Sequence, residues 1–189
     1  MKVIQICGTN GTGKTTLVKG LLNSGAFLRM DLPVGGENKE WWYDGEVAVI
    51  GRYGRNNCCG LDAGNYSGEQ IYKHLDVILS VYEPNAVVFE DVRYGTLYSF
   101  KSRMRTIAEK HGGTFCVVAL YMPLERAAER VFERTGNESI NIDAIRSKQV
   151  QVLRSTRKIQ SEGVEAHFID TSITDKKRLL YTLGRIIHE

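Results

Sequence analysis

The sequence predicts a three-layer α/β/α fold, in which helices cover both faces of a central parallel sheet of about five strands. Short runs rich in Val, Ile and Phe alternate along the chain with segments whose apolar residues recur at helical spacing. Continuously apolar strands separated by helices are typical of parallel sheets that are buried on both faces. The 189 residues suit one domain spanning residues 1–189, and the 42% of apolar residues is enough to form a substantial core.

The predicted strands are short apolar runs, at residues 2–7, 26–30, 46–53, 86–90, 114–121 and 166–169. Two of them, AVVFE at 86–90 and TFCVVALY at 114–121, are apolar almost throughout, as central strands are. The predicted helices lie between and after them, at residues 14–23, 68–82, 97–110, 124–134, 142–161 and 176–188. In the second helix Ile71, Leu75, Ile78 and Leu79 recur three or four positions apart, which places them on one face.

Composition excludes several classes of protein. The formal net charge of +3 is compatible with an anionic substrate but does not by itself indicate nucleic-acid binding. No apolar run reaches the roughly 18 residues of a membrane-spanning helix. The four cysteines include no C-x-x-C pair, which argues against a zinc site. We therefore expect a cytoplasmic protein.

Residues 8–15 read GTNGTGKT and match the phosphate-loop pattern G-x-x-x-x-G-K-[ST] in full. A predicted strand precedes them and a predicted helix follows. Glycines allow successive backbone N–H groups to turn inward around phosphate oxygens, and the helix adds the positive end of its dipole. We expect this P-loop to bind ATP and Mg²⁺, with Lys14 between the β- and γ-phosphates and the Thr15 hydroxyl on the metal. The predicted nucleotide-binding residues are Gly8, Thr9, Asn10, Gly11, Thr12, Gly13, Lys14, Thr15 and Thr16.

Acidic residues follow two of the predicted strands. Glu90 and Asp91 follow Val87-Val88-Phe89, and one of them is expected to reach the metal, because neighbours on a strand face opposite ways. Asp31 follows the second strand and is a candidate base for the acceptor hydroxyl, although it equally suits a turn before Pro33. Asp62, just after Gly60, is the second candidate base.

Arg126, Arg130 and Arg134 follow one another at four-residue spacing, which places them on one helix face. Arg130 and Arg134 precede a Thr-Gly-Asn break and are predicted to stabilise the transferring phosphoryl group from a lid-like segment at about 124–141. For Arg126 a solvated position beside the neighbouring glutamates is favoured.

The stretch at about 33–65 is rich in glycine and is predicted to be an insertion that forms the acceptor site. It holds Trp41 and Trp42, one of which is expected to stack on a nucleobase while at least one anchors the segment to the core. Arg52, within this stretch, and Arg93, beyond it, are candidates to hold phosphate, or are solvated.

Three segments of the chain resemble nucleotide and nucleoside kinases of the P-loop group. They are the GTNGTGKT loop, the Asp31-Leu32-Pro33 turn and the MPLERAAERVFERTGN segment. The resemblance implies a nucleoside-monophosphate-kinase-like fold and places the end of the last strand, residues 167–172, near the adenine. The Asp-Arg pair that clamps the acceptor phosphate in monophosphate kinases is absent from this chain.

A narrower resemblance, to phage kinases of 5-hydroxymethyluracil DNA, involves VIGRY at 49–53, CCGLD at 58–62 and VFE at 88–90. It implies a modified base in DNA as the acceptor and the cytoplasm of an infected bacterium as the location. The sequence thus favours transfer of the γ-phosphoryl group of ATP to the hydroxymethyl group of that base. A small-molecule nucleoside or nucleotide kinase is the alternative, and a P-loop ATPase that switches partners is the third hypothesis.

Overall fold

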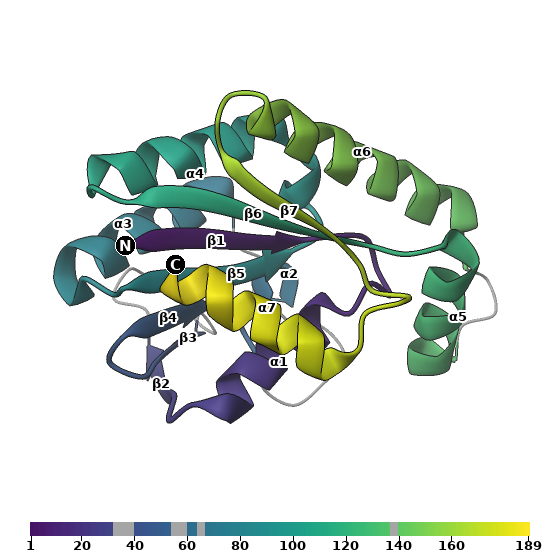
Figure 1. The fold of residues 1–189 in the computed structure, drawn as a ribbon, viewed down its shortest axis with the longest axis horizontal. Helices are drawn as coiled ribbons and strands as arrows, with labels where there is room; N and C mark the ends of the chain where they lie inside the picture. The colour runs from purple at the N-terminus through teal and green to yellow at the C-terminus, as the bar shows by residue number, and fades with distance from the viewer. Residues whose placement is uncertain (32–39, 54–59, 64–66, 137–139) are drawn as a thin grey trace.

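The structure, a computed structural model, describes residues 1–31, 40–53, 60–63, 67–136 and 140–189 (Figure 1). Seven strands form a single sheet: β1 (Lys2–Cys7), β2 (Leu28–Asp31), β3 (Glu40–Tyr43), β4 (Val47–Ile50), β5 (Ala86–Asp91), β6 (Thr114–Tyr121) and β7 (Glu165–Asp170). The helices are α1 (Lys14–Ser24), α2 (Gly60–Ala63), α3 (Gly68–Tyr82), α4 (Tyr98–Lys110), α5 (Leu124–Thr135), α6 (Ile142–Gln160) and α7 (Lys176–His188), with a 3₁₀ turn η1 (Tyr94–Thr96).

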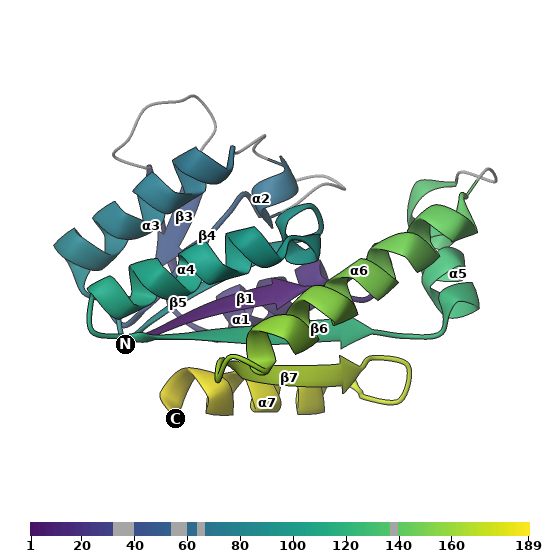
Figure 2. The ribbon, with the colours of Figure 1, turned by 90° about the horizontal axis from the view of Figure 1, so that it is seen from above.

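The predicted three-layer architecture is confirmed. Helices α3, α4 and α6 cover one face of the sheet, and α1 and α7 cover the other (Figure 2). The strand order is β2-β3-β4-β5-β1-β6-β7, and the five strands from β4 to β7 in this order pair in parallel. The carboxyl ends of these five strands therefore meet at one edge of the sheet, where ligands bind in open α/β folds.

The predicted number of about five strands is too low, because a β2–β3 hairpin extends the sheet to seven. Strand β3 pairs antiparallel with both β2 and β4, with Trp41 opposite Ile50 and Trp42 opposite Val49. The Asp44 carboxylate accepts hydrogen bonds from the backbone N–H groups of Glu46 and Val47 and closes the turn between β3 and β4. Glu40–Tyr43 is a strand because aromatic side chains fit a pleated, half-buried surface.

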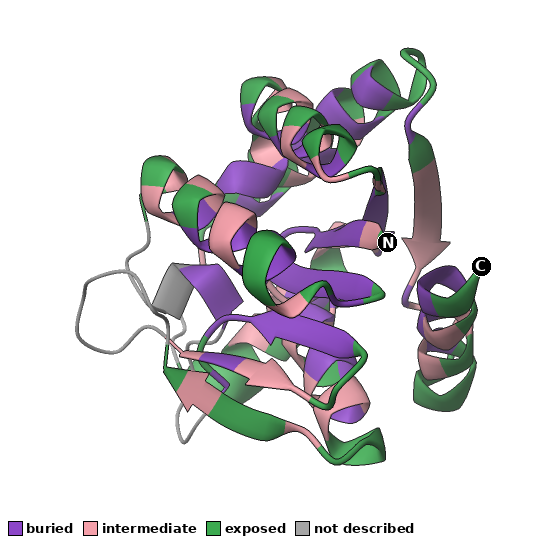
Figure 3. Ribbon diagram, turned by 90° about the vertical axis from the view of Figure 1, so that its left-hand side faces the viewer, coloured by how far each residue is buried: buried purple, intermediate pink, exposed green. Residues whose placement is uncertain are grey.

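The core has two large parts, one on each face of the sheet, because successive strand residues point to opposite faces (Figure 3). A small third cluster contains Met122, Ala127 and Ile145. Val3 and Val87 pack beneath α3, α4 and α6, whereas Ile4 and Val88 pack against α1 and α7. Cys7 and Cys116 are buried within these parts as free thiols, and burial raises the pKa of Cys116 to about 12.

The long helices begin and end close to the residues that the sequence indicates. Ser67 and Gln70 form a capping box at the start of α3, and Asn141 and Asp175 cap α6 and α7. The lid-like segment at about 124–141 corresponds to α5 and the residues that lead into α6, although residues 137–139 lie outside the described part of the chain. Within the described ranges, no helix is both long enough and apolar enough to cross a membrane.

Candidate active site

The phosphate loop connects the end of β1 to the start of α1, as predicted. Gly11 and Gly13 have φ values of 84° and 87°, which side chains with a Cβ rarely adopt. A Cβ on Gly11 would lie 2.4 Å from the carbonyl oxygen of Ala127, so the loop packs directly against α5. No side chain caps the first turn of α1, which leaves its N–H groups for an anion.

Lys14 lies along the phosphate loop and bonds to its backbone. Its Nζ donates a 3.0 Å hydrogen bond to the carbonyl oxygen of Thr9, and the Thr12 hydroxyl donates to the same oxygen at 2.9 Å. Lys14 is largely buried, with 7% of its surface exposed, although it lines the adjoining cleft. Its positive charge therefore lies at the wall of the cleft, beside the phosphate loop.

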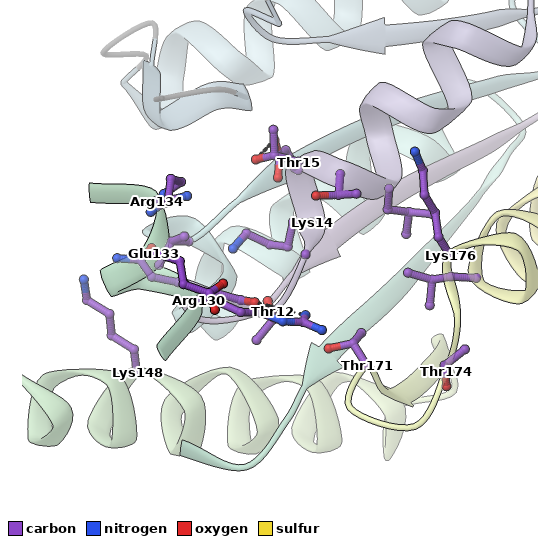
Figure 4. A pocket seen from close by; sticks show the side chains of 18 of the residues that line it. Thr12, Lys14, Thr15, Arg130, Glu133, Arg134, Lys148, Thr171, Thr174 and Lys176 are labelled. Atoms are coloured by element: carbon purple, nitrogen blue, oxygen red, sulfur yellow. Dashed lines mark hydrogen bonds between the residues drawn. The ribbon is translucent and has the colours of Figure 1, made fainter. Parts of the chain in front are cut away.

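A cleft of about 1080 Å³ opens above the loop. Figure 4 shows Lys14, Arg130, Glu133, Arg134 and Lys148 grouped on one side of it, and Thr171, Thr174 and Lys176 on the other. Of the predicted nucleotide-binding residues, the cleft is lined by Asn10, Gly11, Thr12, Gly13, Lys14, Thr15 and Thr16. Gly8 and Thr9 lie behind it: Thr9 has no exposed surface, and a Cβ on Gly8 would meet the Leu120 oxygen at 2.5 Å.

The two acids at the end of β5 have different roles in the structure. Glu90 lines the cleft, and its Oε1 accepts a 2.8 Å hydrogen bond from the Thr15 hydroxyl. Asp91 does not line the cleft: its Oδ2 accepts from Gln5 Nε2 at 2.8 Å, and its Oδ1 accepts from the backbone N–H of Gly95. We expected one acid of this pair to reach the metal, and Glu90 is the one that lines the cleft. The choice of Asp91 as a candidate metal ligand is corrected, because its carboxylate bonds to Gln5 and Gly95 away from the cleft.

Helix α5 brings two of its three spaced arginines to the cleft. Arg130 and Arg134 line it, and Arg130 Nη1 lies 3.5 Å from the carbonyl oxygen of Gly11. Arg126 is not among the lining residues, which agrees with the solvated position expected for it. The Arg130 guanidinium therefore lies beside the phosphate loop, and Arg130 and Arg134 both line the cleft.

The part of the cleft where we expect the acceptor to bind lies beyond the end of β5. Gly60, at the start of α2, packs so closely on Glu90 that a Cβ there would meet the Glu90 Cγ at 2.6 Å. Asp62 is two residues further along this helix, although its side chain lies outside the described part of the structure. Arg93 is exposed and lines the cleft, whereas Arg52 pairs through its backbone with Gly60 and is not a lining residue.

Asp31 lies further from the loop than the sequence suggested. It ends β2, which is an outer strand separated from β1 by β3, β4 and β5. Four strand spacings correspond to roughly 19 Å. Strand β4 pairs with β5, so the end of β4 lies nearer to the phosphate loop than the end of β2 does.

The two tryptophans lie on opposite faces of β3. Trp41 has no exposed surface; its Nε1 donates to the Asp31 carbonyl oxygen at 3.3 Å and its ring meets Tyr82 edge-on at 4.7 Å. The prediction of Trp41 as a stacking residue is therefore wrong, because both faces of its ring are covered. Trp42 is partly buried against the α1 side of the sheet and is not a lining residue of the cleft.

Several lining residues were not singled out from the sequence. Lys148 and Gln151 come from α6, Thr171 and Thr174 come from the connection between β7 and α7, and Lys176 is the first residue of α7. The Asp170 carboxylate accepts from the N–H and hydroxyl of Ser172 and orders this connection. The resemblance of residues 167–172 to an adenine-proximal segment was the available indication for this wall. For α6, only a general basic character was visible.

The fold and the phosphate-loop cleft resemble those of P-loop kinases, enzymes that transfer a phosphoryl group from ATP to a hydroxyl group. The similarity of the chain to phage DNA kinases is confirmed: it is 28% identical to the 5-hmdU DNA kinase of Pseudomonas phage M6, over 97% of this chain and 100% of that protein. It is 29% identical to the 5-hmdU DNA kinase of Delftia phage PhiW-14 over 86% of this chain, and the chain spans 65% of that protein's length. No protein-family model matches the sequence.

Solved structures with the same fold are also kinases or nucleotide complexes. The YorR protein of Bacillus subtilis, in complex with phosphorylated GDP, has a TM-score of 0.60 at 15% identity, over 98% of this chain and 95% of that chain. A gluconokinase from Sinorhizobium meliloti has a TM-score of 0.54 at 14% identity, over 99% and 94% of the two chains. At such identities the likeness shows a shared fold and does not indicate the acceptor.

Proposed function

We propose that this kinase phosphorylates the hydroxymethyl group of 5-hydroxymethyluracil in DNA. The observation that carries the proposal is the match to the 5-hmdU DNA kinase of phage M6 over 97% of this chain and the whole of that protein. The acceptor side of the cleft supports it, because the exposed guanidinium of Arg93 is suited to an anionic acceptor such as the DNA backbone.

Each part of the cleft then has a role in phosphoryl transfer. The loop N–H groups and Lys14 bind the β- and γ-phosphates of ATP, and Thr171 and Thr174 border the nucleoside. Arg130 and Arg134 stabilise the charge of the phosphoryl group as it moves. The acceptor oxygen attacks the γ-phosphorus, the bond to the β–γ bridging oxygen breaks, and ADP leaves. Asp62, on the helix that packs against Glu90, accepts the hydroxyl proton. Asp31, the other candidate base from the sequence, ends an outer strand of the sheet.

The residues present fit a magnesium ion. A buried carboxylate and a hydroxyl within 2.8 Å of each other, Glu90 and Thr15, are oxygen donors of the type that Mg²⁺ prefers. When bound, the ion neutralises phosphate charge. Glu90 orients the Thr15 hydroxyl, and both line the cleft beside the loop.

The direct test follows the label from γ-³²P-ATP. The protein is incubated with hydroxymethyluracil DNA, unmodified DNA, free nucleosides and free nucleotides, and Lys14→Ala serves as the inactive control. We expect label in hydroxymethyluracil DNA alone, and loss of at least about a hundredfold in rate with Lys14→Ala, since one preorganised charge contact contributes several kcal/mol. Efficient labelling of thymidylate or a free nucleoside, with hydroxymethyluracil DNA unlabelled, contradicts the proposal and makes this a small-molecule kinase.

A further inference from the structure

Two charged side chains are buried behind the acceptor side of the cleft and do not line it. Lys101 of α4 has no exposed surface, and Asp91 at the end of β5 is 1% exposed. Burial removes both charges from water, which costs several kcal/mol per ion unless hydrogen bonds and opposite charge compensate. The contacts of the two side chains show which groups compensate these charges.

Both side chains bind the same backbone residue, Gly95. The Gly95 N–H donates to Asp91 Oδ1, and the Lys101 ammonium donates to the Gly95 carbonyl oxygen. Ser155 of α6 completes the arrangement: its Oγ accepts from Lys101 at 3.0 Å and lies 3.0 Å from the Gly95 oxygen. The other Asp91 oxygen accepts from Gln5 of β1. Elements from both ends of the chain therefore converge on one peptide segment.

Packing fixes Gly95 as firmly as these hydrogen bonds do. A Cβ at this position would lie 2.6 Å from the Cβ of Cys7 and 3.2 Å from Asp91 Oδ1. The turn is thus seated directly on the end of β1, the strand that leads into the phosphate loop. A small displacement of Gly95 would move the turn relative to that loop.

The segment around Gly95 forms part of the cleft wall. Val92, Arg93 and Thr96 line the cleft, while the ring of Tyr94 stacks on Phe100 at 4.7 Å. The Arg93 guanidinium lies 5.4 Å from the centroid of the Tyr94 ring. The location of Arg93 therefore depends on the turn that Asp91 and Lys101 hold from behind.

We propose that Lys101 and Asp91 are positioning residues, which act through Gly95 to hold Val92, Arg93 and Thr96 where the acceptor binds. Neither Lys101 nor Asp91 is among the lining residues of the cleft. The inference deepens the proposed function and rests on it for the identity of the acceptor. The network itself is independent of which acceptor is used, which allows the two to be tested apart.

The kinetic test compares Lys101→Met with Lys110→Met. Lys110 is on the same helix but bonds to Asp76 at the surface, so the pair is matched in element and chemistry. We expect Lys101→Met to raise the acceptor KM at least about tenfold, since small misplacements of positioning groups are costly. The ATP KM should stay within about twofold, because the phosphate loop is intact. Lys110→Met should change neither constant.

Hydrogen exchange supplies a readout that does not require turnover. In Lys101→Met, with no acceptor present, the amides of residues 92–96 should exchange at least about tenfold faster than in the native protein, while those of α1 are unchanged. Asp91→Asn/Lys101→Met removes both charges, leaves no uncompensated buried ion, and serves if the single variant does not fold. Ser155→Ala should shift exchange in the same direction.

A folded Lys101→Met or double variant with native acceptor KM and native exchange at 92–96 overturns the inference. The inference is also overturned if the variant unfolds at a lower denaturant concentration while both KM values stay native. In that case Lys101 contributes to stability alone. If the native protein labels no DNA acceptor, the proposed function fails. The exchange rates at 92–96 then still decide whether Lys101 and Asp91 hold this wall.

Discussion

The hydroxyl of Thr15 donates a 2.8 Å hydrogen bond to Oε1 of Glu90 and so joins the first turn of α1 to the end of β5. In the register of the sheet, Glu90 pairs with Ile6 and Asp91 pairs with Cys7, the last residue before the phosphate loop. Since neighbouring strand residues point in opposite directions, only one of the two acids faces the cleft. The division of roles between Glu90 and Asp91 follows from this alternation.

A first prediction separates these two acids. Glu90→Gln should raise the Mg²⁺ concentration for half-maximal activity at least about tenfold, because it removes a negatively charged oxygen donor from the cleft. Asp91→Asn is the matched control and should leave that concentration near the native value, since Asp91 bonds to Gln5 and Gly95. Activity is measured against Mg²⁺ after treatment with EDTA. An equal Mg²⁺ shift in both variants would show that the assignment to Glu90 alone is wrong.

A second prediction concerns the arginines of α5. Arg134→Ala and Arg130→Ala should each lower kcat about a hundredfold or more, because they remove charge that stabilises the moving phosphoryl group. Arg126→Ala, four residues before Arg130 on the same helix, should leave kcat close to native, since Arg126 does not line the cleft. Steady-state rates and circular dichroism of the three variants decide this. A comparable loss in Arg126→Ala would mean that the helix, and not the two lining side chains, is responsible.

The phosphate loop was predictable because its determinants are contiguous in the sequence. Glycines at fixed spacing, Lys14 and Thr15 all lie within one strand–loop–helix unit, so no long-range information is required. The β3–β4 hairpin also had a local indication: Asp44-Gly45 between two β-prone runs is a common hairpin turn, and Gly45 has a φ of 99°. The prediction of about five strands was therefore too low, although the turn that joins β3 to β4 could be recognised in the sequence.

The acceptor side was not predictable in the same way, because it depends on strand order. Asp31 follows the second strand in the chain, but β4 is the strand that pairs with β5. Sequence proximity cannot show that the β2–β3 hairpin lies on the outside of β4. The buried state of Trp41 has a similar origin, since its surroundings include Tyr82, 41 positions further along the chain. Such contacts are fixed by tertiary packing and not by local composition.

A third prediction links pH to stability through Asp76. Hydrogen bonds from Lys110 and then His111 hold the pKa of this carboxyl below its ordinary value. A lowered folded-state pKa contributes stability above the unfolded pKa of about 3.9, and the contribution is lost as the pH falls through the folded pKa. Asp76→Asn should thus lower the urea midpoint at pH 7, with a difference from native protein that shrinks below about pH 4. A difference that stays constant down to pH 2 would contradict the assigned shift.

The last prediction addresses the acceptor and its base. Asp62→Asn should lower turnover on hydroxymethyluracil DNA about a hundredfold or more while changing DNA affinity only a few-fold, because a base acts mainly in the transition state. Asp31→Asn is the matched control and should stay near native, since Asp31 ends an outer strand of the sheet. DNA affinity itself should fall steeply with salt, and Arg93→Ala should reduce the slope of log K against log salt by about 0.7 for single strands if Arg93 neutralises one phosphate. Turnover and fluorescence anisotropy on the same oligonucleotide separate the two effects. If Asp31→Asn is the variant that loses turnover, Asp31 at the end of β2, and not Asp62 on the helix beside Glu90, supplies the base. If DNA affinity does not depend on salt, the proposal that Arg93 binds the DNA backbone is wrong.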